Sequence, residues 1–184
     1  MKDIEQRKAD HIQVSLEEQV VSGHNYWDDL HLIHDSLPEV DLEEVDTTTV
    51  LFGKKLSAPL MVTAITGGYA EAEKVNRNLA KACASLGIAL GVGSQRAAIE
   101  RGDRSSYEVI RDLGVPLVIG NLGAPQLIAQ ARKEAFGLEE ARQAMEMIGA
   151  DVLAIHLNFL QEVAQPEGDT RARGCLDAIR SLAR

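Results

Sequence analysis

Short and almost continuous apolar segments recur at regular intervals along the later part of the chain. They begin at residues 60, 88, 116 and 151 and span 60–63, 88–92, 116–120 and 151–156. Because apolar residues follow one another without alternation, each segment is typical of a strand buried on both faces. The interval between them matches a strand–helix–strand unit of roughly 30 residues. The pattern therefore predicts a parallel sheet.

Amphipathic helices are predicted between these strands, over 72–86, 105–113 and 138–148, and a fourth over 175–183. The first has apolar residues at the three- and four-residue spacing of one helix face. These are Val75, Leu79, Ala82 and Leu86. A glycine follows each of the first three helices, as expected of a helix C-terminus: Gly87, Gly114 and Gly149. The alternation indicates an α/β fold with right-handed crossovers.

The length of the chain bears on whether such a sheet closes into a barrel. A (β/α)₈ barrel typically needs roughly 250 residues, and this chain has 184 residues with four strand–helix units. We predict that residues 59–184 form the first half of a TIM barrel. Residues 1–58 are predicted to be a polar N-terminal extension with a short hairpin over 47–56. A complete open sheet of the flavodoxin type is the alternative, although such a domain does not normally carry so long a polar segment before its first strand.

Composition and charge exclude several classes of protein. The net charge of −9 disfavours a nucleic-acid partner, because an acidic surface repels polyanions. The two cysteines, Cys83 and Cys175, form no CxxC pair, so a disulfide scaffold is not expected. The N-terminus is polar and no apolar run approaches the 18 residues or so of a membrane span. These features predict a cytoplasmic protein that does not cross a membrane.

Polar residues follow the first two predicted strands, where ligands collect in parallel α/β folds. The segment 63–68 contains two threonine hydroxyls and a Gly-Gly pair that would let a flat ligand or a phosphate approach the backbone. The next loop contains Ser94, Gln95 and Arg96, and its guanidinium suits an oxyanion. An ordinary turn and a solvated arginine at a helix start are the alternatives.

The third and fourth predicted strands also end in polar residues. Segment 121–126 offers amides that could face a heteroaromatic ring, although amides are common in turns. If extended geometry continues to Asn158, His156 and Asn158 point to the same face. A buried, hydrogen-bonded histidine is the alternative for His156. Glu162 is the kind of oxygen ligand that Mg²⁺ takes together with phosphate oxygens.

A cationic cluster near the N-terminus completes the candidate set. Arg7, Lys8 and His11 lie within five residues of one another in an otherwise acidic chain. A solvated basic patch is the alternative interpretation of this cluster.

Five motifs, in this order and at this spacing, closely resemble type 2 isopentenyl-diphosphate isomerases along the whole chain. They are RKADH at 7–11, MVTAITGG at 61–68, GSQR at 93–96, NLGA at 121–124, and HLNFLQE at 156–162 with QPEGD at 165–169. The resemblance implies a TIM barrel that binds FMN and interconverts isopentenyl and dimethylallyl diphosphates. It also implies a requirement for reduced FMN and Mg²⁺, NADPH as the reductant, and a homo-oligomer for the full-length protein.

The resemblance also implies roles for individual residues. The diphosphate would be held by Arg7, Lys8, His11, Ser94 and Arg96. The flavin would be lined by Thr63, Ala64, Ile65, Thr66, Ser94 and Asn121. Gln161 and His156 would be the catalytic pair beside the double bond, and Asn158 would complete the polar wall around the substrate. Glu162 would hold Mg²⁺ against the diphosphate.

The chain departs from this family in its length, because family members are about twice as long. We therefore expect a fragment of a functional isomerase, with unpaired sheet edges and weak binding of FMN on its own. Two other functions stay open. One is another FMN barrel, such as a 2-hydroxy-acid oxidase, which would not need Arg7, Lys8 and His11. The other is a stand-alone α/β binding or assembly module.

Overall fold

The computed structural model describes residues 10, 13–20, 23–64, 66–69, 71–131, 133–166 and 168–184. The chain divides between Thr47 and Thr48 into two units. In the first unit, residues 13–17 are helical and two short 3₁₀ helices follow, η1 (Tyr26–Asp29) and η2 (Leu42–Glu44). Residues 13–20 and 23–47 are all exposed. The boundary predicted after residue 58 rests on composition, and it stays a prediction.

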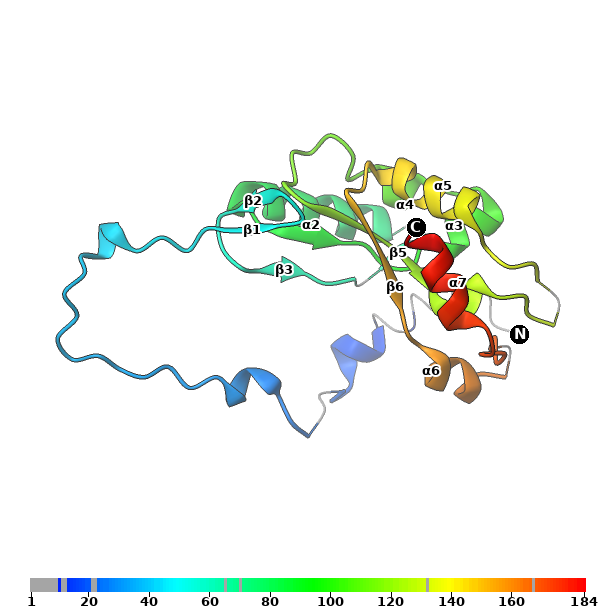
Figure 1. Ribbon diagram of the computed structural model, residues 1–184, viewed down its shortest axis with the longest axis horizontal. Helices are drawn as coiled ribbons and strands as arrows, with labels where there is room; N and C mark the ends of the chain where they lie inside the picture. The colour runs from blue at the N-terminus through cyan, green and yellow to red at the C-terminus, as the bar shows by residue number, and fades with distance from the viewer. Residues whose placement is uncertain are drawn as a thin grey trace. The chain divides into compact units, whose positions relative to one another are not determined.

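The second unit contains a parallel sheet of four strands in the order β3-β4-β5-β6, which confirms the predicted α/β class (Figure 1). The strands are β3 (Met61–Val62), β4 (Ala89–Gly91), β5 (Val118–Gly123) and β6 (Val152–His156). Neighbouring strands are parallel throughout. In the part of the chain that the structure describes, β3 and β6 are edge strands with one neighbour each. All four carboxyl ends therefore lie along one edge of the sheet.

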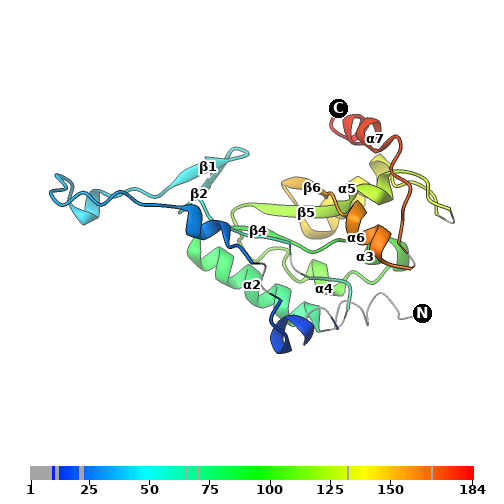
Figure 2. The same ribbon diagram turned by 90° about the horizontal axis from the view of Figure 1, so that it is seen from below.

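Helices lie between the strands in the chain and after the last of them (Figures 1 and 2). They are α2 (Ala72–Leu86), α3 (Arg96–Arg101), α4 (Ser105–Glu108), η3 (Ala124–Leu127), α5 (Leu138–Ile148), α6 (Phe159–Ala164) and α7 (Cys175–Leu182). Helix α2 contacts β3 and β4, α5 contacts β5 and β6, and α7 contacts η3. The bounds predicted for 72–86 and 138–148 are confirmed, and both helices end at a left-handed glycine, Gly87 and Gly149.

The structure differs from the sequence prediction in three places. Helix α4 ends at Glu108 rather than at residue 113, and the chain turns at Asp112, whose φ is +62°. Strand β5 continues through Asn121 to Gly123, because these residues pair with Ala154, Ile155 and His156 of β6. Helices α3 and α6 lie where loops were expected.

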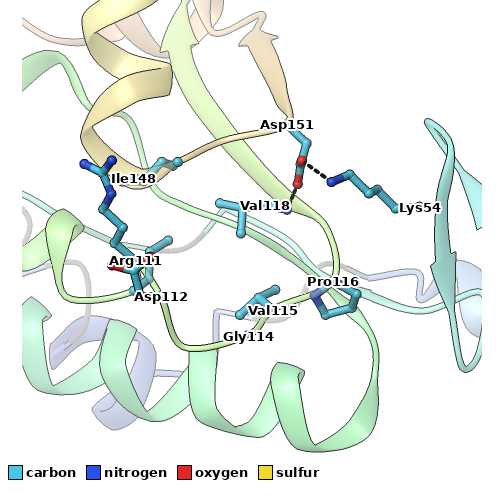
Figure 3. A pocket seen from close by; sticks show the side chains of 11 residues that line it. Lys54, Arg111, Asp112, Gly114, Val115, Pro116, Val118, Ile148 and Asp151 are labelled. Carbon is cyan, nitrogen blue, oxygen red and sulfur yellow. Dashed lines mark hydrogen bonds and ion pairs between the residues drawn. The ribbon is translucent and has the colours of Figure 1, made fainter.

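The antiparallel hairpin predicted before the sheet is confirmed as β1 (Thr49–Leu51) and β2 (Lys54–Leu56). Leu56 is buried against Ala89 and Leu117 at the start of β4 and β5. Lys54 Nζ lies 2.7 Å from Asp151 Oδ1, and Asp151 Oδ2 accepts a hydrogen bond from the Val118 amide at 3.0 Å (Figure 3). Although burial opposes it, Lys54 holds the pKa of Asp151 below its usual value. These contacts fasten the hairpin to the amino-terminal edge of the sheet.

A pocket of about 360 Å³ opens at this amino-terminal edge, beside the Lys54–Asp151 pair (Figure 3). Arg111, Pro116 and Ile148 contribute to its lining. Among the described residues, Arg96, Asn121 and His156 lie at the other ends of the strands. In parallel α/β folds the carboxyl ends carry the ligands and the amino ends serve stability, so the candidate site is sought at the carboxyl edge.

Candidate functional site

The loops that follow β3 and β4 are in direct contact. The Gly93 amide donates to the Thr66 carbonyl at 3.1 Å. A Cβ atom added to Gly93 would lie 2.6 Å from the carbonyl carbon and oxygen of Thr66, closer than side chains approach a backbone. The absence of a side chain at residue 93 therefore lets the Thr66 loop and the Ser94 loop form one surface.

Gln95 joins this surface to the neighbouring strand and helix. Its side chain is 0% exposed, and its Oε1 accepts from the Asn121 amide at 2.9 Å. Its Nε2 donates to the Ala144 carbonyl of α5 at 2.7 Å. The backbone amide of Gln95 also donates to the Asn121 carbonyl at 2.9 Å. Sequence reasoning noted the amide of Gln95 but assigned it no role, since only the fold brings Asn121 and Ala144 to it.

Arg96 begins α3 and points into a network of charges. Its Nη2 lies 2.6 Å from Asp169 Oδ2, and its Nε donates to Glu100 Oε1 at 2.9 Å. Lys133 Nζ lies 3.7 Å from the same Asp169 oxygen. Burial would lower the pKa of Arg96, but the two carboxylates outweigh it and raise that pKa. The alternative of a solvated arginine at a helix start is wrong, because the Arg96 side chain is only 16% exposed.

His156 and Asn121 form a pair at the ends of β6 and β5. Nδ1 of His156 lies 2.6 Å from Oδ1 of Asn121, so the ring donates there and Nε2 is left as an acceptor. A Cβ on Gly123 would lie 3.0 Å from His156 Nε2, so the ring lies against the strand backbone. Burial lowers the pKa of His156, and the charge of Glu162 and the backbone of Leu122 offset part of this shift. The imidazole is therefore neutral at pH 7.

Stability should depend on this neutral histidine. Because the folded-state pKa lies below the unfolded value of 6.5, the unfolded chain takes up the proton first as pH falls. Stability is complete above about pH 6.5 and decreases as pH falls toward the folded pKa. We expect His156→Gln to lose this part of the pH dependence in urea unfolding curves recorded between about pH 5 and pH 8. His31→Gln, at an exposed position, should keep it. An unchanged pH profile for His156→Gln would contradict the assignment.

Strand β6 ends at His156, so the premise that extended geometry reaches Asn158 is wrong. Asn158 is the N-cap of α6, with φ −120° and ψ 25°. Its Nδ2 donates to Glu162 Oε1 at 2.9 Å, while its buried Oδ1 has no hydrogen-bond partner in the described part of the chain. The helix therefore turns Asn158 onto Glu162, one turn further along, rather than alongside His156.

Glu162 is buried at the centre of a second set of contacts. Its Oε2 accepts from the Asp169 amide at 2.8 Å. A Cβ on Gly168 would lie 1.7 Å from the Glu162 carbonyl oxygen, so the chain before Asp169 returns onto α6 at van der Waals distance. Asp169 then reaches Arg96. The structure thus links the predicted metal ligand to the predicted diphosphate ligand through one aspartate, which sequence reasoning missed.

The remaining predicted residues are not joined to these contacts. Thr63 and Ala64 are exposed after β3, and Gln161 is exposed on α6. Arg7, Lys8, His11 and Ile65 lie outside the described residues. Among the residues that the structure covers, no three His, Cys, Asp or Glu side chains gather as a metal centre. None of the described helices is long and apolar enough to cross a membrane.

Comparison with known proteins identifies the family. Residues 4–108, more than half of the chain, match the family described as FMN-dependent dehydrogenase. The chain belongs to this family. Membership in this family supports the expectation of FMN as a cofactor.

The names of individual relatives are more specific than this family description. The chain is 46% identical over 181 residues to an isopentenyl-diphosphate delta-isomerase of Thermoplasma acidophilum, covering 98% of this chain and 52% of that protein. It is 44% identical to the enzyme of the same name from Halobacterium salinarum, over 97% of this chain and 49% of the relative. The one from Methanothrix thermoacetophila is 46% identical over 95% of this chain and 48% of its own length. The sequence resemblance to isopentenyl-diphosphate isomerases is confirmed, and the chain spans about half the length of these relatives.

Proposed function

We propose that these residues are the N-terminal half of a (β/α)₈ barrel that interconverts isopentenyl and dimethylallyl diphosphates with reduced FMN and Mg²⁺. One observation carries the proposal: four consecutive parallel strands end at one edge in hydroxyl, amide, imidazole, guanidinium and carboxylate groups. The names and coverage of the relatives support this reading, since about half of each relative aligns with almost all of this chain.

The carboxyl edge fits a phosphorylated flavin in the chemistry of its donors. Thr63 and Ala64 are exposed beside the close contact of Gly93 with Thr66, and Asn121 and His156 follow on the next two strands. A neutral imidazole and hydroxyl and amide groups suit the polar edge of a flat heteroaromatic ring. Bound reduced FMN would supply an electron-rich ring that stabilises positive charge and exchanges a proton.

Mg²⁺ would be held by Glu162 together with phosphate oxygens of the substrate. Mg²⁺ is commonly bound through one or two carboxylates plus substrate phosphates, so a single buried carboxylate fits this role. Each Glu162 oxygen accepts one N–H and keeps a further lone pair. Asn158, which donates to this carboxylate, has a buried Oδ1 with no hydrogen-bond partner among the described residues, and this oxygen would offer an acceptor to a water on the metal.

Arg96 would bind the diphosphate, and in the structure its guanidinium is held by Asp169. The guanidinium has five N–H donors, of which Asp169 and Glu100 engage those on Nη2 and Nε. A diphosphate that approaches Arg96 would take the N–H donors that these two carboxylates leave, or would displace the Asp169 carboxylate from Nη2. Because the backbone N–H of Asp169 donates to Glu162, displacement of Asp169 from Arg96 would also disturb the hydrogen bond to the proposed metal ligand.

His156, Asn158 and Gln161 would surround the hydrocarbon. The neutral His156 ring donates through Nδ1 to Asn121 and presents Nε2 as an acceptor, so it can take up a proton but carries no charge beforehand. Gln161 is exposed on α6, and its amide would lie beside the double bond of the substrate. Binding energy from the diphosphate would orient the alkene against these groups.

A 2-hydroxy-acid oxidase is the second candidate, favoured by the dehydrogenase description of the family. It would remove hydride from an acid and would not need the cationic cluster near the N-terminus. NADPH as reductant, a homo-oligomeric full-length protein, a cytoplasmic location and the roles of Arg7, Lys8 and His11 stay predictions within the isomerase proposal.

The proposal is tested by supplying the other half of the barrel. The chain is mixed with the C-terminal half of the Thermoplasma acidophilum relative, reduced FMN, Mg²⁺ and isopentenyl diphosphate, and dimethylallyl diphosphate is measured by NMR. Turnover is expected, and Lys8→Ala should raise the substrate KM about 10- to 100-fold, since a charge-assisted hydrogen bond to phosphate is lost. Lys55→Ala, on an exposed strand, is the matched control. Oxidation of a 2-hydroxy acid that is indifferent to Lys8→Ala would favour the oxidase instead.

A further inference from the structure

The two loops proposed to line the flavin rest on buried polar side chains of α2 and α4. Ser106 and Tyr107 of α4 are 2% and 0% exposed, and Asn76 of α2 is also buried. A buried polar group is costly unless it is hydrogen-bonded, so the partners of these side chains indicate what they do. All three have partners in the backbone between Thr66 and Ser94 or in each other.

Ser106 and Asn76 hold the loop after β3. The Gly68 amide donates to Ser106 Oγ at 2.8 Å. Asn76 Nδ2 donates to the Ser106 carbonyl at 2.7 Å and to the Thr66 carbonyl at 3.4 Å. Residues 66–68 lie outside the described strands, and these side chains add hydrogen bonds to their backbone.

Tyr107 contacts both loops. Its hydroxyl donates to the Ser94 carbonyl. A Cβ on Gly67 would lie 2.2 Å from Cε1 of the Tyr107 ring, so Gly67 lies flat against that ring. Burial, with a smaller contribution from the Asp103 charge, raises the pKa of Tyr107, and the hydroxyl therefore keeps its proton at neutral pH. A phenylalanine would fill nearly the same volume, so the hydrogen bond to the Ser94 carbonyl is what the tyrosine hydroxyl adds at this position.

We propose that Tyr107 is a positioning residue of the flavin site, which fixes the spacing between the Thr66–Gly68 loop and the Ser94–Arg96 loop. It touches neither the proposed flavin nor the substrate, and it acts through Gly67 and Ser94. Ser106 supports the first of the two loops in the same way. The inference rests on the proposed function, because a fixed spacing matters only if one ligand contacts both loops.

Tyr107→Phe removes the hydroxyl and keeps the ring against Gly67. FMN is titrated into the chain by equilibrium dialysis up to about 1 mM, since weak affinity is expected of a partial barrel. The dissociation constant should rise about 5- to 10-fold, the usual effect of losing one buried hydrogen bond. The visible absorption band of bound FMN should also shift, because the loops around the ring change their spacing. Tyr26→Phe, at an exposed tyrosine, should change neither quantity.

A neighbouring pair of serines gives a second comparison. Ser106→Ala leaves the Gly68 amide without its acceptor, whereas Ser105 is exposed and its Oγ donates to Asp103 at 2.9 Å. Ser106→Ala should weaken FMN binding by a similar factor, and Ser105→Ala should not. Affinities are measured at a temperature where every variant is fully folded, so that a change in melting temperature alone does not enter.

The possible outcomes distinguish a failure of the positioning role of Tyr107 from a failure of the proposed flavin site. If wild type binds FMN and Tyr107→Phe binds it with the same constant and spectrum, Tyr107 is an ordinary core residue and the inference is overturned. If wild type binds no FMN, alone or with the C-terminal half of the relative, the flavin site itself is overturned and the positioning role falls with it. Weaker binding with a shifted band in Tyr107→Phe, with Tyr26→Phe and Ser105→Ala unchanged, supports the inference.

Discussion

Gly93→Ala is expected to destabilise the chain by about 3 kcal/mol, at the upper end of what an added methyl group costs in a well-packed region. The new Cβ would lie 2.6 Å from the Thr66 carbonyl, whose atoms belong to the backbone and cannot rotate away. Gly93 has no positive φ, so the effect is steric rather than conformational. The loop after β3 has to move, and the hydrogen bond from the Gly93 amide to Thr66 is strained or lost.

The control lies two residues earlier, at the last residue of β4. A Cβ on Gly91 would meet its nearest atom, the Ala64 nitrogen, at 3.4 Å, which is ordinary contact. Gly91→Ala should therefore be neutral or stabilise slightly, because alanine restricts the unfolded chain. Urea unfolding of both variants measures the difference. Equal midpoints for the two would show that the loops after β3 and β4 do not meet as described.

Elements with a strong local signal were predicted well. Helices α2 and α5 combine a helical apolar period with a glycine at the C-terminus, and the structure places both at the predicted bounds with φ +64° at each glycine. The four apolar segments became the four parallel strands in chain order. These features were accessible because periodicity and left-handed glycine are properties of a few adjacent residues.

Elements decided by distant partners were not predicted. Helices α3 and α6 have six residues each, too few for a helical period to stand out from a loop. Asn121 and Gly123 have poor strand propensity, yet β5 continues through them because β6 supplies their partners. Tertiary pairing overrides local preference at this position, and no single-sequence pattern reports it.

In the candidate site, too, local features were predicted and contacts between distant segments were not. The types of residue at the strand ends were predicted, since a guanidinium, an imidazole or a carboxylate is visible in the sequence. Their pairing was not: Arg96 with Asp169, and Glu162 with the Asp169 amide, join segments that only the fold brings together. The contacts of Ser106 and Tyr107 with the two loops could not be predicted, because nothing in the neighbouring sequence distinguishes a serine or tyrosine that holds a loop from one that does not.

Gln95→Leu is the second large effect that we expect, a loss of about 2–4 kcal/mol in the free energy of unfolding. Leucine has a similar size but makes no hydrogen bond, so the buried Asn121 amide loses its acceptor, and the Ala144 carbonyl, which lies within α5, loses a donor that it has in addition to its helical one. The orphaned amide costs about 1–3 kcal/mol, and the lost hydrogen bond to Ala144 about 0.5–1.5 kcal/mol more. Gln143→Leu on α5 is the matched control, since the hydrogen bond from its side chain to Glu139 is exposed and a change within about 0.5 kcal/mol is expected.

Gln95→Glu separates the hydrogen bonds of Gln95 from its volume. The backbone partners fix the orientation of the native amide, because an N–H can only donate and a carbonyl can only accept. A carboxylate can accept from Asn121 but cannot donate to Ala144, and its burial raises its folded-state pKa above the unfolded value of about 4.3. Measured relative to wild type at each pH, the destabilisation should therefore shrink as pH falls through the folded pKa, when the protonated acid becomes a donor again. A pH-independent difference, or a Gln95→Leu variant as stable as Gln143→Leu, would show that Gln95 does not tie the Ser94 loop to β5 and α5.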